Sequence, residues 1–473
     1  MRRKVKSERI TLTQIEITDA GAEGKAIGHH DGKVIFVTNA VPGDIADVQI
    51  TRSKKSFMEG KAVHFHTLSD KRATPFCEHF GFCGGCKWQH LQYEQQLFYK
   101  QKQVIDNFER IAKVEMPKIN PILASEYETC YRNKLEYTFS DYRWLTDDDM
   151  KSDDRANINM NALGFHIAQH FDRVLDLTKC FLQAEPSNLI RNSVKAFCIE
   201  QGFTFYNPRH HTGFLRNLII RNTTLGETMA IMVFAEPHPE HEALVLNHIL
   251  STYPSLTSLM YVVNTKLNDT IADLDIQCFH GQNYITEQLG NLHFRIGPVS
   301  FFQTNSRQAL RMYNIVKDFA AITPDSIVYD LYTGTGTIAN FVARDAKKVV
   351  GIEYVPSSVE DAKMNSAFNE ITNTEFIAGD IAKILTPDFF SLHGSPDIII
   401  TDPPRNGMHA DVVEQIVQAA PQRIIYVSCN PATQARDLAL LCERYKITAI
   451  QPLDMFPHTH HVENIVLLEK LKR

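Results

Sequence analysis

The feature that most constrains the fold is an alternation of short apolar runs and helical patterns that begins near residue 297. Each apolar run has the length of a strand and is followed by a polar or amphipathic stretch of helical length. This alternation is typical of a parallel sheet whose strands are joined by crossover helices. Residues 297–473 are therefore predicted to form a Rossmann-like α/β domain.

Side chains suited to ligand binding follow several of the predicted strands. The strand Ile327–Asp330 runs into the glycine-rich turn DLYTGTG, and later strands end at Glu353, Asp380 and Asp402. A strand, a glycine-rich turn and a helix N-terminus form a binding edge of the nucleotide type. A carboxylate at the position of Glu353 accepts hydrogen bonds from ribose in dinucleotide enzymes and in methyltransferases. This block alone therefore does not choose between a nicotinamide cofactor and S-adenosylmethionine.

A cysteine follows the predicted strand Ile424–Val427, within the sequence YVSCNPAT. A thiol at the carboxyl end of a strand in an α/β sheet lies on the edge where such sheets bind ligands. A single cysteine is more often a small buried residue. The residues around Cys429 favour a functional role instead.

Three blocks occur in order between residues 402 and 463, namely DPPRNG (Asp402–Gly407), YVSCNPAT and DMFPHTHHVE (Asp454–Glu463). Together they resemble the RNA uracil-5-methyltransferases, which use S-adenosylmethionine and a catalytic cysteine. The resemblance implies that Cys429 is the nucleophile and Glu463 the base. It also implies contacts with S-adenosylmethionine from Gln303, Tyr332, Glu353 and Asp402, and from Asp380 near the adenine. Thr333 stands where many relatives have a cysteine that has no part in the catalytic scheme.

The chemistry of this family explains why a thiol and a carboxylate are needed. Addition of a thiolate to C6 of uracil makes C5 nucleophilic enough to take a methyl group, and a base then removes the C5 proton. The scheme calls for a thiol of low pKa. The target base has to leave its RNA stack to reach the pocket.

Aromatic and histidine side chains near these blocks are candidates for lining the pocket. Phe301, Phe302 and Phe456 are candidates for stacking on the base, with core packing as the alternative for each. His458, His460 and His461 are expected to form a hydrogen-bonding wall rather than a metal site.

Residues 1–68 have the pattern of a small β-barrel. Leu12–Ile17 alternates between apolar and polar residues, and GAEGKAIG and GKVIFVTNAVPGD supply glycine-rich and Pro-Gly turns between strands. The layout resembles a TRAM domain, an RNA-binding barrel of the oligonucleotide-binding type. The clusters MRRKVKSER and TRSKKSF suit phosphate contacts, although a solvated basic face explains each equally well. The chain as a whole has a net charge of −6, which does not itself indicate a nucleic-acid partner.

Residues 69–296 are predicted to form an α+β domain that carries a cysteine cluster. Cys77, Cys83 and Cys86 have C-x5-C-x2-C spacing, and Cys180 is the best candidate for a fourth ligand. Spacing alone does not separate a structural zinc ion from an iron–sulfur cluster. The resemblance favours a [4Fe–4S] cluster. Residues 180–202 are predicted to be helical, and LTDDDMKSDDRANINM is expected to be a solvated hairpin tip or a mobile insertion.

Length and composition set the remaining expectations. A chain of 473 residues is too long for one core, so a multidomain protein is expected. There is no apolar signal-peptide core and no membrane-spanning run, and nine cysteines suit a cytosolic protein better than a disulfide framework. We expect a cytoplasmic monomer with no membrane partner, acting on RNA. Within the family, a barrel with a cysteine cluster favours 23S ribosomal RNA over transfer RNA. A non-catalytic RNA-binding protein of the same fold is the alternative from another class.

Overall fold

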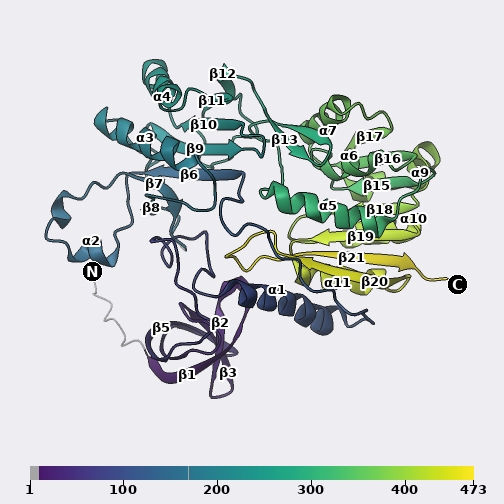
Figure 1. Ribbon diagram of the computed structural model, residues 1–473, viewed down its shortest axis with the longest axis horizontal. Helices are drawn as coiled ribbons and strands as arrows, with labels where there is room; N and C mark the ends of the chain where they lie inside the picture. Colours follow the sequence, from purple (N-terminus) through teal and green to yellow (C-terminus); the bar gives the residue numbers. More distant parts are fainter. Residues whose placement is uncertain (1–9, 169, 473) are drawn as a thin grey trace.

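The computed structural model describes residues 10–168 and 170–472, arranged as a small barrel and two larger sheets (Figure 1). The barrel is closed, with strand order β1-β2-β3-β5-β4. Its strands are β1 (Thr11–Ala20), β2 (Ala26–His30), β3 (Lys33–Thr38), β4 (Ile45–Ser53) and β5 (Phe57–Thr67). Inward-facing residues such as Ile17, Ile35 and Val48 are buried and form its core, as the alternating sequence pattern requires. Residues 51–56 at the β4–β5 hairpin are exposed, whereas the predicted basic cluster at residues 1–9 lies outside the described residues.

A seven-stranded sheet of order β12-β11-β10-β9-β6-β7-β8 forms the middle of the chain. Its strands are β6 (Lys134–Ser140), β7 (Ala162–His166), β8 (Val174–Asp176), β9 (Leu215–Asn222), β10 (Thr228–Phe234), β11 (Ser258–Val263) and β12 (Gln277–Gly281). Helices α3 (Ser187–Glu200) and α4 (Pro239–Thr252) lie against it, and the hairpin of β13 (Ile285–Leu289) and β14 (Leu292–Ile296) follows it. Helix α3 begins later than predicted, at Ser187, and Cys180, Phe181 and Leu182 line a cavity instead of forming its first turn. The acidic insertion contains the short exposed helix α2 (Asp147–Lys151).

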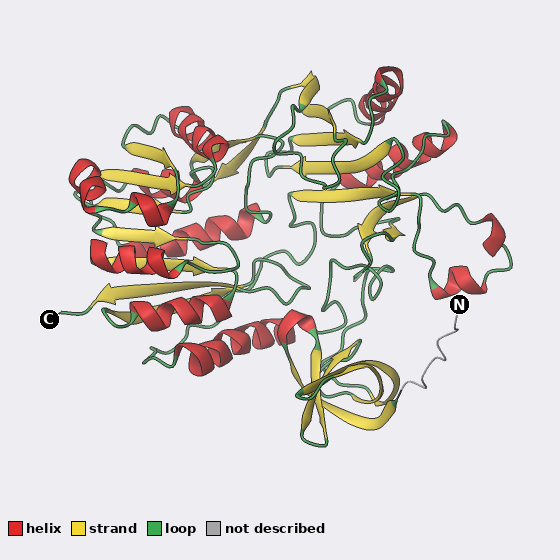
Figure 2. Cartoon of the chain, turned by 180° about the vertical axis from the view of Figure 1, so that it is seen from behind, coloured by secondary structure: helices red, strands yellow, loops and turns green. Residues whose placement is uncertain are grey.

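The C-terminal sheet has the order β17-β16-β15-β18-β19-β21-β20, with five parallel strands and an antiparallel pair at one edge (Figure 2). Its strands are β15 (Ile327–Leu331), β16 (Lys348–Glu353), β17 (Thr374–Ala378), β18 (Ile398–Thr401), β19 (Arg423–Ser428), β20 (Tyr445–Leu453) and β21 (Glu463–Lys470). The helices between and before the strands are α5 (Ser306–Ala320), α6 (Thr337–Ala343), α7 (Pro356–Phe368), α8 (Ile381–Ile384), α9 (Pro387–His393), α10 (Ala410–Ala419) and α11 (Pro431–Leu441). All four residues of β18 are buried, as expected for a strand covered on both faces. The prediction of a multidomain fold with an N-terminal barrel and a Rossmann-like C-terminal part is confirmed.

Helix α1 (Tyr93–Asn107) follows the cysteine segment in sequence but packs on the C-terminal sheet. Val104 of α1 and the following residues Phe108 and Ala112 share a core with Ala435 and Leu438 of α11. Figure 1 shows α1 running alongside α11 and β20, far along the sequence from both. The middle and C-terminal parts of the chain are therefore joined by a helix as well as by loops. No helix among the described residues is long and apolar enough to cross a membrane.

Candidate active site at the carboxyl edge of the C-terminal sheet

The carboxyl ends of the parallel strands bring the predicted site residues to one edge of the sheet. Tyr332 follows β15, Glu353 ends β16, Asp402 follows β18 and Cys429 follows β19. Asp380 lies just beyond β17 and caps helix α8 by accepting a hydrogen bond from the Ala382 amide at 3.1 Å. The sheet therefore gathers five of the predicted side chains on the edge where α/β proteins bind ligands.

Glu463 reaches the same edge from the opposite chain direction. Strand β21 is antiparallel to β19, and Ser428 pairs with Asn464 in the register of the two strands. Cys429 and Glu463 are therefore the next residues at the end of this pair, on adjacent strands. The negative charge of Glu463 acts on the thiol of Cys429, as expected for neighbouring side chains.

The glycine-rich turn after β15 is held by buried polar contacts. Asp330 accepts hydrogen bonds from the Thr333 hydroxyl at 2.6 Å and the Ala339 amide at 3.0 Å. Glu353 accepts from the amides of Gly334 at 3.0 Å and Val355 at 2.9 Å. The Thr333 hydroxyl thus ties the turn to strand β15. No sequence pattern indicated this role.

The local backbone of this turn leaves room for a ligand. Tyr332 has a φ of 62°, a conformation that is costly for a bulky residue and tends to occur at functional sites. Gly334 also has a positive φ, and a Cβ atom placed there would meet only Phe301, at 3.9 Å. The backbone can therefore lie directly against a bound molecule, and the residues around it fit an adenosyl group.

Two carboxylates at this edge have no hydrogen-bond or ion-pair partner among the described residues. Asp402 is half-buried and Glu463 is buried, with 5% of its surface exposed. Burial raises the pKa of Asp402 to about 7, and repulsion from Asp330 adds to the effect. Burial raises the pKa of Glu463 well above its usual range, with further repulsion from Asp402 and a smaller opposing effect of Arg405. Unpaired acids with raised pKa values in a recess are typical of a reactive site.

The thiol of Cys429 also has a raised pKa, of about 11. Burial is the main cause, followed by the negative charges of Glu463 and Asp402, and Arg405 opposes them. The structure therefore differs from the expected low-pKa thiol, because the sulfur is largely buried and has two acids but only one cation near it. Arg405 lies in the DPPRNG block, but its residue type alone did not mark it as a neighbour of the sulfur.

The raised thiol pKa predicts that methylation accelerates with pH. At pH values below its pKa of about 11, the thiolate fraction of Cys429 rises about tenfold for each unit by which the pH increases. We expect the single-turnover rate, at saturating RNA and S-adenosylmethionine, to climb steadily from pH 6.5 to pH 9. A rate that is constant over this range would contradict the assignment of the thiol as the group that must ionise.

The other predicted pocket residues divide between surface and core. Gln303 is half-exposed in the loop before α5, and its carbonyl accepts a hydrogen bond from Asn133 at 2.9 Å. Phe302 is buried against Phe294, so it belongs to the core. Phe301 is 64% exposed, and Phe456 is half-buried. Of the three aromatic candidates, Phe301 and Phe456 remain accessible to a base.

The three histidines of DMFPHTHHVE lie in the loop that leads to Glu463. His458 has a φ of 62°, and its main chain is tied to the segment that follows the cysteine cluster. Burial lowers the pKa of His458 and of His460 to about 4, and that of His461 to about 3. All three imidazoles are therefore neutral at physiological pH and can line a pocket without adding charge.

The four predicted cluster cysteines meet at one cavity. Cys77, Cys83, Cys86 and Cys180 line it together with apolar side chains such as Phe165. Burial raises the pKa of all four thiols, to about 11 for Cys83 and about 12 for Cys86. In the described part of the chain, no three His, Cys, Asp or Glu side chains are arranged to hold a single metal ion.

Comparison with known proteins finds relatives that match almost the whole chain. The family profile tRNA (Uracil-5-)-methyltransferase matches residues 275–471, and the TRAM domain profile matches residues 8–63. An uncharacterized RNA methyltransferase of Bacteroides thetaiotaomicron is 55% identical over 95% of this chain and 99% of its own length. Another, from Porphyromonas gingivalis, is 50% identical over 96% of this chain and 99% of its own length.

A solved structure agrees with these relatives. The Pyrococcus abyssi tRNA (uracil-54, C5)-methyltransferase in complex with S-adenosyl-L-homocysteine matches with a TM-score of 0.73 and 27% identity, over 96% of this chain and all of that one. These matches confirm the predicted TRAM barrel, an RNA-modifying enzyme and the use of S-adenosylmethionine, and they count against a non-catalytic protein of the same fold. The chain therefore belongs to the RNA uracil-5-methyltransferase family.

Proposed function

We propose that the protein transfers a methyl group from S-adenosylmethionine to C5 of a specific uridine in 23S ribosomal RNA, through a transient bond between Cys429 and C6. The observation that carries the reaction is the pairing of β19 with β21, which puts Cys429 and Glu463 on neighbouring strand ends beside the glycine-rich turn. A thiol and a carboxylate without other partners suit addition and proton removal on one ring.

In the first step the Sγ atom of Cys429 bonds to C6 of the uracil. The electron pair of the C5–C6 double bond moves toward O4, and C5 becomes nucleophilic. The raised pKa leaves little thiolate at neutral pH, so the thiol first gives its proton to solvent and the thiolate then adds to C6. When bound, S-adenosylmethionine supplies the electrophilic methyl group that C5 takes up. Gln303, Tyr332, Glu353, Asp380 and Asp402 are the residues proposed to hold it.

In the last step the Glu463 carboxylate takes the proton from C5. The electron pair of that C–H bond re-forms the C5–C6 double bond, and the C6–S bond breaks to release the thiolate. A carboxylate with a raised pKa is a stronger base than an ordinary glutamate, so burial of Glu463 favours this transfer. Arg405, whose positive charge acts on both groups, offsets part of the negative charge at the site.

The cavity of Cys77, Cys83, Cys86 and Cys180 is proposed to hold a [4Fe–4S] cluster. Each cysteine of such a cluster binds a different iron atom, so the sulfur atoms lie farther apart than the four thiolates around one zinc ion. The convergence of four thiols on one cavity supports a metal centre there, and the family resemblance favours the cluster over zinc. Its role would be structural, since the reaction on uracil transfers no electron.

Anaerobically purified protein is therefore expected to be brown, to show the broad visible absorption of an iron–sulfur cluster and to contain about four iron atoms per chain. Replacing Cys180 by serine should lower the iron content, because one iron then loses its thiolate. A colourless protein with about one zinc atom per chain would overturn the cluster assignment.

Transfer RNA is the second candidate substrate. The observation that favours it is the match over almost the whole chain to an enzyme named for uracil 54 of tRNA. The proposal of 23S ribosomal RNA depends on the family resemblance of a barrel joined to a four-cysteine cavity. We expect the protein to act as a monomer in the cytoplasm in either case.

The substrate is tested by mapping 5-methyluridine in total RNA from a strain that lacks the gene. We expect one 5-methyluridine to disappear from 23S ribosomal RNA and to return when the wild-type gene is restored. Loss of 5-methyluridine from transfer RNA alone would select the second candidate. Unchanged modification in both RNAs would contradict the proposal.

A further inference from the structure

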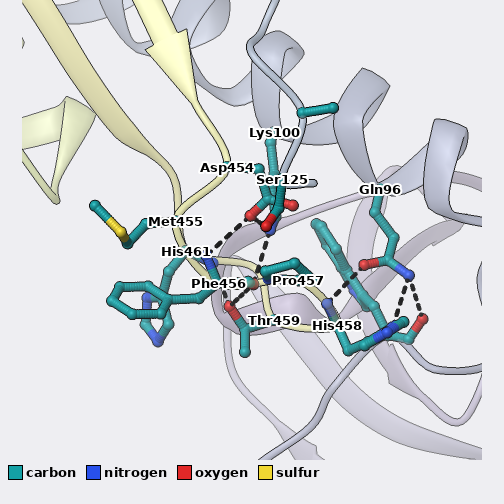
Figure 3. Close-up of polar contacts among 12 residues, drawn as sticks. Gln96, Lys100, Ser125, Asp454, Met455, Phe456, Pro457, His458, Thr459 and His461 are labelled. Atoms are coloured by element: carbon teal, nitrogen blue, oxygen red, sulfur yellow. Dashed lines mark hydrogen bonds and ion pairs between the residues drawn. The ribbon is translucent and has the colours of Figure 1, made fainter. Parts of the chain in front are cut away.

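A buried ion pair lies at the start of the loop that leads to Glu463. Lys100 of helix α1 extends its Nζ atom to Asp454, at 2.6 Å from Oδ1, and to the carbonyl of Phe456 at 3.0 Å (Figure 3). Both charged side chains are fully buried. Asp454 follows β20, and the turn from Asp454 to His458 begins the connection to β21. The pair therefore joins a helix near residue 100 to the last turn before the proposed base.

The carboxylate of Asp454 accepts hydrogen bonds from three donors, of which Lys100 is one. Its Oδ1 atom also accepts from the Phe456 amide at 3.0 Å, and its Oδ2 atom accepts from the Tyr93 hydroxyl at 2.9 Å. The Tyr93 oxygen in turn accepts from the Ser125 amide at 2.8 Å. A buried carboxylate with three donors is fixed in position, and removal of Lys100 would leave it as an unpaired buried charge.

All five consecutive main-chain carbonyls of the turn are held from outside it. The donors come from helix α1, from the start of α5, from the loop that leads to β6 and from the segment after the cysteine cluster. They are Gln308 to Asp454, Asn305 to Met455, Lys100 to Phe456, Tyr131 to Pro457, and the amides of Lys87 and Trp88 to His458. Lys100 is the one charged side chain in this set, so it contributes the strongest single anchor.

Gln96, one helical turn before Lys100, completes the attachment to α1. Its Oε1 atom accepts from the His458 amide at 2.8 Å, and its Nε2 atom donates to the carbonyls of Trp88 and Leu91. Figure 3 shows Gln96 and Lys100 pointing from the same helix toward opposite ends of the turn. Helix α1 therefore forms hydrogen bonds with both the first and the last residue of the turn.

Cys429 is held by other elements. Asn430 caps helix α11 by accepting from the Ala432 amide at 3.1 Å, and its Nδ2 atom donates to the Arg405 carbonyl at 3.0 Å. Ser428 belongs to the buried strand β19. The sulfur therefore has supports that do not pass through the turn, whereas Glu463 begins β21 after residues 459–462 and pairs with Leu453, the residue directly before the turn.

We propose that Lys100 and Asp454 are positioning residues that hold the 454–458 turn so that the Glu463 carboxylate meets the C5 proton. This inference rests on the proposed roles of Cys429 and Glu463. Reacting groups have to be held to within a fraction of an ångström, and a displacement of about 1 Å can cost about 100-fold in rate. Loosening the turn should therefore slow proton removal much more than addition of the thiol.

The test replaces Lys100 by methionine, which keeps the length of the side chain and removes its charge. We expect turnover on ordinary uridine RNA to fall about 100-fold. A methylated protein–RNA adduct that resists denaturant should accumulate in the presence of S-adenosylmethionine. The rate of adduct formation with 5-fluorouridine RNA, which cannot lose a proton from C5, should stay within about threefold of wild type, because Cys429 is held by elements outside the turn.

Lys102→Met is the matched control. Lys102 lies on the same helix, is partly exposed, and pairs with Asp106 at 2.7 Å and Asp19 at 2.8 Å, away from the turn. It should turn over ordinary RNA like wild type. Lys100→Arg keeps the charge and should recover part of the lost turnover, which loss of packing alone would not explain.

Two further variants cover a failure to fold. If Lys100→Met is unfolded by circular dichroism, Asp454→Asn and the neutral pair Lys100→Met/Asp454→Asn replace it, because the pair leaves no buried charge uncompensated. Equal slowing of both RNAs, or normal turnover in a folded variant, would overturn the positioning role. Failure of the wild-type protein to form any adduct with 5-fluorouridine RNA would instead overturn the proposed covalent reaction.

Discussion

Replacing Cys429 by alanine is expected to abolish methyl transfer to RNA while leaving the fold intact. The sulfur is the atom proposed to bond C6, and no second thiol lies at this edge of the described sheet. Loss of a covalent nucleophile that works together with a base typically lowers the rate by about 10⁴-fold or more. The measurement is incorporation of a labelled methyl group into RNA under single-turnover conditions.

The same variant should lose the covalent adduct with 5-fluorouridine RNA. Wild-type protein is expected to give a protein–RNA band that survives denaturing electrophoresis and requires S-adenosylmethionine. Cys442→Ala is a matched control, since Cys442 is also half-buried with a pKa raised to about 11 but caps the far end of α11. An adduct that persists in Cys429→Ala, or vanishes in Cys442→Ala, would place the nucleophile elsewhere.

Much of the C-terminal fold follows from short-range sequence patterns. Buried parallel strands read as continuous apolar runs, and the side chains after β15, β16, β18 and β19 were predictable as one edge because parallel strands point the same way. The hairpin strand β13 and the antiparallel strands β20 and β21 were not predicted. Strand β20 contains polar residues and a proline, so its sequence lacks the apolar run that marks the parallel strands.

The electrostatics of the site could not be read from the sequence. The motif that contains Cys429 suggested a thiol of low pKa, but the pKa depends on which charges surround the sulfur in three dimensions. Glu463 comes near it only because β21 turns back beside β19. The roles of Cys429 and Glu463 in catalysis, and of the S-adenosylmethionine residues, stay predictions that the geometry supports.

The contacts of the 454–458 turn likewise could not be predicted from the sequence. Lys100 and Asp454 are 354 positions apart, and neither residue type signals a partner when the chain is read in order. Lys100 lies in helix α1, and a lysine in a helix is expected to face solvent. A long-range buried pair of this kind is defined by tertiary packing alone.

Replacing Glu463 by glutamine is expected to stop the reaction after the methyl group has been transferred. Glutamine has nearly the same shape, so the buried site should keep its packing, but it cannot accept the C5 proton. Loss of a general base typically costs 10²–10⁴-fold, and we expect turnover on ordinary uridine RNA to fall by about that factor. The methylated adduct should accumulate, as measured by denaturing electrophoresis and mass spectrometry of the RNA.

Adduct formation itself should not be slower in this variant. The charge of Glu463 raises the pKa of Cys429, so its removal favours the thiolate. Glu469→Gln is the matched control, because Glu469 lies on the same strand and pairs with Arg423 at 3.2 Å, far from the sulfur. If Glu463→Gln neither formed an adduct nor methylated RNA, Glu463 would be needed before proton removal, and its role as the base would be wrong.

Combining Glu463→Gln with Lys100→Met separates positioning from direct chemistry. If Lys100 acts through Glu463, its replacement has little left to disturb once the carboxylate is gone, and the two losses in turnover should not multiply. We expect the double variant to turn over within about threefold of Glu463→Gln alone. Losses that multiply would mean that Lys100 affects a different step, and that the turn supports the reaction by a route other than the placement of Glu463.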